Sequence, residues 1–376
     1  MSDNYNFNKM NKSASSRSKN RRIKLVLGIM LSMIIILGIS LLSVIYYYQK
    51  RIELLSAEIK SGVRDEIIEE LKSEGLLFTE AVVVEDEIDP EEEAAIRQDS
   101  YEEFRNTLRT LMEGEDATTA NMLREFFPEK IIAFYKGQYH FLDYEGNEKL
   151  NEYNNDLFVA DDRGRINYED ENYQCYTGID VAKFQGNIDW EKVKNDGIDF
   201  ALLRVAVRGY TKGALSIDDK YEYNMENATK QGLHVGAYVF TQAKNKAEMD
   251  EEIDMVLENV EGYAFDGPIV LDVEDVENGG GRTKDLTKEE RTELVRYFCD
   301  RIRQAGYEPM LYGNLITCAI MLDMGELTDV DLWYAYYSEP LYAPYDFDIW
   351  QYTDSAKVSG IKGKVDMNIM LRSWWE

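Results

Sequence analysis

Short apolar segments alternate with amphipathic stretches in the second half of the chain, from about Tyr176 to Glu376. Eight apolar segments have the length and composition of strands. Helical-period stretches that end near a glycine separate the first five, whereas the last three follow one another too closely for full helices. This pattern favours a small, irregular (β/α) barrel over a doubly wound open sheet, which remains the alternative. The eight segments are YTGIDV, FALLRVAV, HVGAYVF, PIVLDVE, PMLYGN, DLWYAYY, DIWQYT and VDMNIML.

The first half of the chain has a different pattern. Residues 1–24 are basic, and residues 25–48 contain no charge and end in three tyrosines. That length matches a bilayer, so we predict a cytoplasmic tail and a single transmembrane helix, with a cleavable signal peptide as the alternative. Residues 49–95 combine a helical apolar period with an acidic linker. They predict a stalk, either a self-associating coiled coil or a single amphipathic helix.

Residues 96–175 are predicted to form a small α+β spacer module before the barrel, which spans residues 176–376. The stretch SYEEFRNTLRTLM is typical of a helix. The stretch IIAFYKGQYHFLDYEGN is typical of a hairpin with Lys136 and Gly137 at its turn. No group of chemically active residues stands out in this module.

Composition excludes several classes of function. The chain has 71 acidic and 42 basic residues and a net charge of -29, which disfavours binding to nucleic acid phosphates. The three cysteines lack metal-site spacing, and two histidines are too few for a His-rich metal centre. No cofactor or metal is therefore expected, and carboxylates remain as the candidate reactive groups.

Four acids lie near the ends of predicted strands. Asp272 and Glu274 end an apolar strand two positions apart, so both face the same way. Asp180 ends the first strand, and Asp366 lies at the start of the last. A lone acid in such a place commonly caps a helix or bonds a turn. Working groups of barrels gather at one end, however, where crowded carboxylates raise one another's pKa and keep a proton for acid catalysis.

Aromatic side chains are frequent on the same predicted strands. Such rings offer a flat stacking surface with a hydrogen-bonding edge, which suits sugars, although most rings of this kind belong to a core. A carboxylate pair beside an aromatic cleft is the composition expected of a glycoside hydrolase. The candidate substrate-binding residues are Tyr238, Tyr312, Tyr337, Trp350 and Gln351.

A set of motifs in this half of the chain resembles the glycoside hydrolase family 25 muramidases, the Chalaropsis-type lysozymes. The resemblance covers about residues 176–376 and none of the preceding chain. The sequence departs from the family pattern at Ala182, where serine is common, and at Val239, where histidine is common. The motifs, in order, are GIDVAKFQGNIDWEKVKNDGIDFALLRVAVRGY, GAYVF, PIVLDVE, YGN, WYAYY, IWQYT and GKVDMN.

The resemblance implies hydrolysis of the β-1,4 bond between N-acetylmuramic acid and N-acetylglucosamine in peptidoglycan glycan strands. Glu274 matches the general acid, and Asp272 matches a companion that stabilises developing charge or positions the acetamido group. Asp180 and Asp366 match the acids of the first and last strands. With the predicted anchor, the enzyme would lie on the outer face of the cytoplasmic membrane of a Gram-positive bacterium.

Two other functions fit the same residues. One is a non-catalytic module that binds or organises the cell wall on the same barrel, although such a module gains little from crowded negative charge. The other is a site in which the acids hold a hard cation such as Mg²⁺ or Ca²⁺, because both ions take oxygen ligands.

Overall fold

The computed structural model describes residues 90–114, 117–263, 265–276 and 281–375. The chain divides into two compact units, Met1–Ala95 and Ile96–Glu376. The predicted tail, apolar segment and stalk up to residue 89 lie outside the described residues.

The prediction of a single-pass protein of the cytoplasmic membrane is corrected here. That prediction depended on residues 25–48, which lie outside the described part of the chain. Within the described part, no helix has both the length and the apolar composition that crossing a bilayer requires. The predicted membrane location and the bilayer as a partner are therefore not retained.

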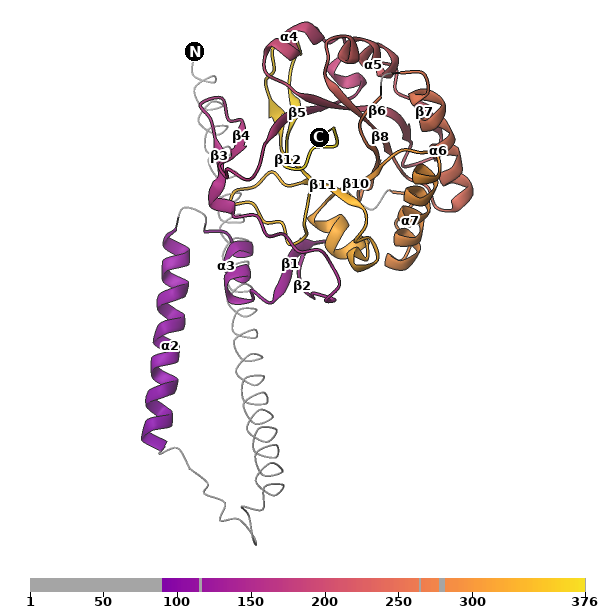
Figure 1. Cartoon of the computed structure of the whole chain (residues 1–376). Coiled ribbons are helices and arrows are strands. Elements are labelled where there is room, and N and C mark those ends of the chain that lie inside the picture. Colours follow the sequence, from indigo (N-terminus) through magenta and orange to yellow (C-terminus); the bar gives the residue numbers. More distant parts are fainter. Residues whose placement is uncertain (1–89, 115–116, 264, 277–280, 376) are drawn as a thin grey trace, which may run out of the picture. The chain divides into compact units, whose positions relative to one another are not determined.

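A closed ring of eight strands forms the centre of the second unit (Figure 1). The strands follow the order β5–β13–β12–β11–β10–β9–β8–β6, and β6 pairs with β5 to close the ring; a short β7 pairs with the outer side of β6. Closure excludes the open doubly wound sheet and confirms the barrel. Bounds of these strands are β5 Tyr176–Val181, β6 Phe200–Arg208, β7 Leu215–Ile217, β8 His234–Phe240, β9 Ile269–Asp272, β10 Pro309–Asn314, β11 Asp331–Ala335, β12 Ile349–Ala356 and β13 Val365–Met370.

One strand of the ring runs against its neighbours. β13 is antiparallel to both β12 and β5, whereas the other neighbouring pairs in the ring are parallel. The short connection between β12 and β13 explains this, because only an antiparallel pair can be joined without a long crossover. The beginning of β13 therefore lies at the edge where the parallel strands end.

Helices cover the outside of the barrel between its first strands. They begin with side-chain caps where the sequence supplies them: Thr287 and Glu290 form a reciprocal capping box at the start of α7. The outward-facing strand residues and the inner faces of these helices form the larger apolar core. The helices are α4 Trp190–Asn195, α5 Tyr221–Lys230, α6 Lys246–Val260 and α7 Lys288–Gln304.

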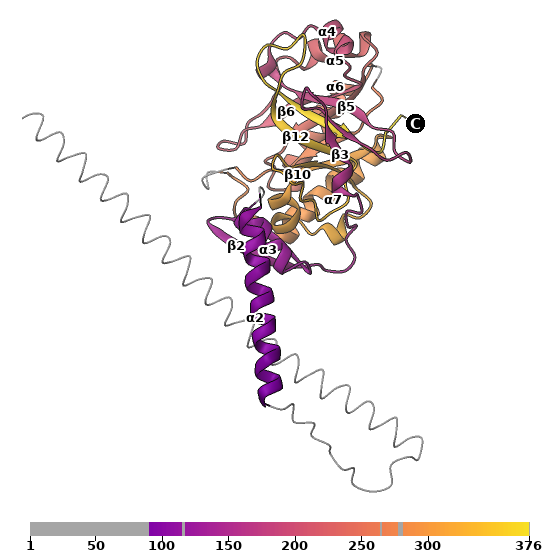
Figure 2. The same cartoon turned by 90° about the vertical axis from the view of Figure 1, so that its left-hand side faces the viewer.

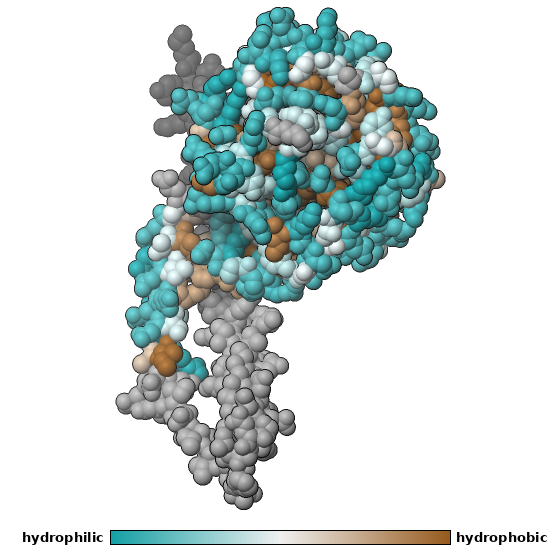
Figure 3. All heavy atoms as spheres, in the orientation of Figure 1, coloured by the Kyte–Doolittle hydropathy of each residue, from teal (hydrophilic) through white to brown (hydrophobic). Residues whose placement is uncertain are grey.

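A second, smaller apolar cluster fills the inside of the barrel. Phe200 occupies the space that a side chain at Gly178 would need, since a Cβ there would lie 2.1 Å from the ring. Trp374 packs against Phe200 where the strands begin, with its ring centroid 5.3 Å from that of Phe200. Figure 3 shows a largely hydrophilic surface around small apolar patches, as the acidic composition leads one to expect.

The described residues before the barrel form two helices and two hairpins. Helix α2 begins at Pro90, inside the stretch predicted as a linker, because proline is well suited to a first helical position. The predicted hairpin is present as β1 and β2, with Lys136 and Gly137 both at positive φ in its turn. The elements are α2 Pro90–Glu113, α3 Thr119–Phe126, β1 Lys130–Tyr135, β2 Gln138–Asp143, β3 Phe158–Ala160 and β4 Ile166–Tyr168.

Candidate active site

The four predicted acids come together at the edge where the parallel barrel strands end. Asp180 lies near the end of β5, and Asp366 lies directly opposite it in the register of β13. Asp272 ends β9, and Glu274 follows two residues later. The pKa of each carboxylate is influenced by at least one other in the group. We call these four residues the carboxylate cluster.

Asp180 is held rigidly at the centre of the carboxylate cluster. Its side chain is buried, and its Oδ2 accepts hydrogen bonds from Gln351 Nε2 at 2.7 Å and Asn368 Nδ2 at 2.9 Å. Burial raises the pKa of Asp180 to about 6, against the opposing effect of the hydrogen bonds from Asn368, Gln351 and Asp366. Asp180 therefore loses its proton more readily than Asp366, its hydrogen-bonded neighbour.

Asp366 holds its proton more strongly. Burial, and then the nearby charge of Asp180, raise the pKa of Asp366 to about 8. The two side chains share a hydrogen bond. At neutral pH the pair therefore carries one proton, with the Asp366 carboxyl donating to the Asp180 carboxylate.

Asp272 and Glu274 differ in their access to solvent. Asp272 is buried and its Oδ1 has no hydrogen-bond partner in the described structure, whereas Glu274 is partly exposed. Burial raises the pKa of Asp272 well above its ordinary value, with further contributions from Glu274 and Asp180; the charge of Arg204 opposes this shift. Burial and then Asp366 raise the pKa of Glu274. The more accessible of these two acids of raised pKa is therefore Glu274.

Two of the predicted substrate-binding side chains contact a third, Gln351. Tyr312 and Tyr337 both donate their hydroxyl groups to Gln351 Oε1, at 2.9 Å and 2.5 Å. Tyr337 is 50% exposed, so its ring is available to a ligand, while Tyr312 is buried. Gln351 thus links the two tyrosines to Asp180. Tyr238 is also brought inside the barrel, where its ring packs against Trp333 at a centroid distance of 5.9 Å.

Trp350 does not join this site, and its prediction as a substrate-binding residue is corrected. Side chains alternate along β12, so Gln351 faces the barrel interior and Trp350 faces outward. The indole of Trp350 packs against Phe158 in the larger core and donates from Nε1 to the Tyr336 carbonyl at 2.8 Å. It is 4% exposed and therefore out of reach of a ligand.

Sequence reasoning missed two polar residues of the site. Asn368 is fully buried, donates to Asp180 and accepts from Trp333 Nε1 at 2.7 Å. It lies two residues after Asp366, so the same alternation that paired Asp272 with Glu274 would have found it. Arg204 lies close enough to affect the pKa of Asp272, and its guanidinium donates to Asp218 Oδ2 at 2.9 and 2.6 Å.

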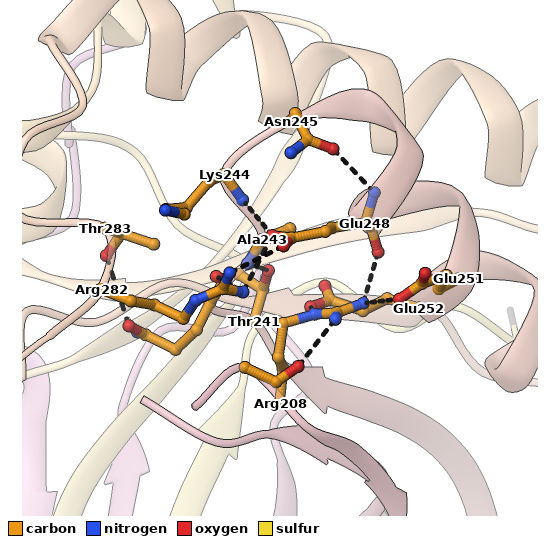
Figure 4. A network of polar contacts seen from close by, with 12 residues as sticks. Arg208, Thr241, Ala243, Lys244, Asn245, Glu248, Glu251, Glu252, Arg282 and Thr283 are labelled. Atoms are coloured by element: carbon orange, nitrogen blue, oxygen red, sulfur yellow. Dashed lines mark hydrogen bonds and ion pairs between the residues drawn. The ribbon is translucent and has the colours of Figure 1, made fainter. Parts of the chain in front are cut away.

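A second acid-rich group lies beside the ends of β6 and β8 (Figure 4). Buried Arg208 donates to Glu252 Oε1 at 2.5 Å and to Glu251 Oε2 at 3.0 Å. Arg282 forms two hydrogen bonds with Glu248, at 2.9 and 2.7 Å. We call these five residues the ionic cluster. It ties the loops after β6 and β8 to the residues that follow β9.

The described residues offer no obvious metal centre. No three His, Cys, Asp or Glu side chains among them are grouped so as to hold a metal ion. The carboxylate cluster offers several acids of raised pKa side by side, which is the composition of a general acid–base site.

Comparison with known proteins agrees with this geometry. Residues 179–361 match the model of glycosyl hydrolases family 25. This part of the chain is similar to that family, and we call it the family 25 domain. It contains Asp180, Asp272 and Glu274, and Asp366 follows five residues after its end.

Individual relatives cover a similar part of the chain. The uncharacterized protein YegX of Escherichia coli O6:H1 is 28% identical over 194 residues, which are 51% of this chain and 68% of the relative. Lysozyme M1 of Streptomyces globisporus is 29% identical over 202 residues, covering 51% of this chain and 66% of the relative. A family 25 glycosyl hydrolase from Bacillus anthracis has 25% identity and a TM-score of 0.44, covering 55% of this chain and 93% of that structure.

The prediction that the chain is a glycoside hydrolase of the muramidase, or lysozyme, type is confirmed by the family match and the lysozyme relatives. The bond that it cleaves and the individual roles of the site residues are taken up next.

Proposed function

We propose that the family 25 domain hydrolyses the β-1,4 bond between N-acetylmuramic acid and N-acetylglucosamine in peptidoglycan. The observation that carries the proposal is the meeting of Asp180, Asp272, Glu274 and Asp366 from three strands at one edge of the barrel, with raised pKa values. The relative named lysozyme M1 supports a cell-wall glycan as the substrate.

Glu274 supplies the proton to the leaving sugar oxygen. It is the more accessible member of the Asp272–Glu274 pair, and burial with the charge of Asp366 favours its protonated form. A general acid with a raised pKa retains its proton near neutral pH and can release it in the transition state.

The remaining acids act on the positive charge that develops at the sugar. An oxocarbenium-like transition state is stabilised by an anion that is already in place and cannot reorient. Asp180 fits this role, because Gln351 and Asn368 fix its carboxylate and its pKa is the lower of the Asp180–Asp366 pair. Asp272, buried between Glu274 and Asp180, is placed to orient the acetamido group of the substrate.

Digestion of purified peptidoglycan, followed by mass spectrometry, tests the proposal. The wild-type chain should release muropeptides with N-acetylmuramic acid at the reducing end. Glu274→Gln should lower the rate about 10²- to 10⁴-fold, because it removes the general acid while keeping the shape of the side chain.

A matched control separates the role of Glu274 from a general effect of charge. Glu261→Gln changes an exposed glutamate after α6 and should leave the rate unchanged. Wall material that pellets with the wild-type chain while no muropeptide is released would instead favour the non-catalytic wall-binding module.

A further inference from the structure

The β1–β2 hairpin, which precedes the family 25 domain, contacts the chain directly after the proposed general acid. The Tyr135 hydroxyl at the end of β1 donates to Asp275 Oδ2 at 2.8 Å, and Asp275 is the neighbour of Glu274. In Figure 2, β2 and the C-terminus lie on opposite sides of the barrel. Because the C-terminal tryptophans pack where the strands begin, the hairpin lies at the end that carries the acids.

The base of the hairpin is buried and contacts the loop between β11 and β12. Ile131, Ile132 and Ala133 are buried, and the Ile132 amide donates to the Tyr342 hydroxyl at 3.0 Å. The Arg124 guanidinium stacks on the Tyr342 ring at 3.6 Å from its centroid. These contacts fix the direction in which the hairpin tip projects, so the tip has a defined position beside Glu274.

The tip combines aromatic rings with a cation. Phe134 is 55% exposed and packs against Tyr139 with a centroid distance of 4.9 Å. Exposed Lys136 sits in the left-handed turn at φ 49° and holds its Nζ 4.7 Å from the centroid of the Tyr135 ring. Flat rings beside an ammonium group suit a ligand with a sugar-like or peptide body and a carboxylate.

Local charge at the tip is positive, although the chain as a whole is strongly acidic. Asp275 lies close to two cations, Lys136 and Arg291. A hydrogen bond with Tyr135 and, to a smaller extent, the charge of Asp275 raise the pKa of Lys136. Burial lowers the pKa of Arg291, and the same carboxylate counteracts that effect. Lys136 and Arg291 are thus two cations close to Asp275, next to the carboxylate cluster.

We propose that the hairpin tip, residues 134–139, is an outer subsite of the cleft that binds carboxylates of the peptide substituents on the glycan strand. This inference rests on the proposed function. In this subsite, Lys136 pairs with the carboxylate and the exposed Phe134 ring packs against the substituent. The Tyr135–Asp275 hydrogen bond keeps the tip at a fixed position relative to Glu274. The module before the barrel thus acts as a specificity element.

The test compares Lys136→Asn with wild type on two forms of one substrate: native peptidoglycan, and peptidoglycan whose carboxyl groups have been amidated chemically. Asparagine tolerates the left-handed turn and removes the charge. On the native form, Lys136→Asn should raise the apparent KM about threefold to fivefold at low salt with kcat unchanged. On the amidated form, variant and wild type should be equal.

Two matched variants complete the experiment. Lys136→Arg keeps the cation and should restore the wild-type KM. Lys230→Asn removes an exposed lysine at the end of α5 and should have no effect on either substrate. An equal KM for Lys136→Asn and wild type on native peptidoglycan, or an equal loss on both substrates, would overturn the subsite. Inactivity of the wild-type chain on both substrates would instead overturn the proposed function.

Discussion

The carboxylate cluster and the ionic cluster are both rich in acids, but only the ionic cluster pairs its acids with arginine. Its buried acid, Glu252, still has a raised pKa, because burial outweighs the hydrogen bonds with Thr241 and Arg208. In the ionic cluster, Arg208 and Arg282 donate directly to the glutamates. Although burial acts to raise it, hydrogen bonds from Arg282 and the Lys244 amide lower the pKa of Glu248. In the carboxylate cluster, the described structure contains no ion pair to any of the four acids, and all four pKa values are raised.

The difference separates a structural role from a chemical one. Pairing with arginine favours the ionised form of an acid, and the pair ties elements together. A buried acid that is surrounded by amides, phenols and other acids has a raised pKa, because no cation stabilises its ionised form. This difference favours the carboxylate cluster, and not the ionic cluster, as the site of the chemistry.

After Glu274, the largest effect on the rate is expected at Asp180. Asp180→Asn should lower kcat on peptidoglycan about 10²- to 10³-fold, because it removes a fixed anion from the transition state. The folded state should lose little or no stability, since one member of a repelling group is neutralised. Reducing-end release and thermal unfolding of the same preparations measure both quantities. Asp162→Asn, at an exposed position, is the matched control, and a variant of Asp180 with full activity would remove this residue from the mechanism.

The opposite result is expected in the ionic cluster. Arg208→Met should lower the free energy of unfolding by about 3–5 kcal/mol, because it leaves buried Glu252 without its cation. Arg163→Met, which breaks a pair whose arginine side chain is 51% exposed, should cost less than about 1 kcal/mol. Urea denaturation of the two variants gives both values. Similar losses of unfolding free energy in both variants would show that burial does not determine how much each ion pair contributes to stability.

The third effect concerns the dependence of stability on pH. Asp366 has a folded-state pKa of about 8, above the ordinary value of 3.8, so the folded chain binds more protons than the unfolded chain between these values. Its contribution to stability must then decrease as the pH rises through this range. Asp366→Asn should remove this decrease in stability. Its Tm should therefore exceed that of the wild type by roughly 4 °C or more at pH 8 and equal it near pH 4. Scanning calorimetry at several pH values measures it, and a Tm gain that is the same at every pH would contradict the assignment.

The smallest effect is expected at the acid beside Glu274. Asp275 is exposed and bonded to Tyr135, so Asp275→Asn should change kcat by no more than about twofold. The neighbouring Glu274→Gln substitution is its counterpart in the same assay. A large loss of kcat in Asp275→Asn would mean that the charge of the whole segment matters, and not the position of one protonated acid.

Much of the barrel could be predicted from sequence because its strands are short, apolar and separated by clear helix ends. The convergence of the acids could be predicted for the same reason: residues at the ends of parallel strands must share one edge. Trp350 was misplaced because residues 349–352 are buried on both faces of β12, so hydropathy gives no alternation from which to read the inward side.

Contacts between distant parts of the chain were beyond the reach of such patterns. Tyr135 and Asp275 are 140 residues apart, and nothing in either local sequence indicates that they meet. Arg204 was missed for a related reason, because a single arginine inside an apolar strand does not reveal its partner. Its place near Asp272 follows only from the closed order of β6, β8 and β9.

The most direct test of the account is a titration of the Asp and Glu carboxyl groups by carbon-13 NMR, with the signals of Asp180 and Asp366 assigned from the Asp180→Asn and Asp366→Asn variants. We predict a pKa of about 8 for Asp366 and about 6 for Asp180. Ordinary values near 4 for both residues would contradict the claim that burial without a paired cation raises the pKa of these acids.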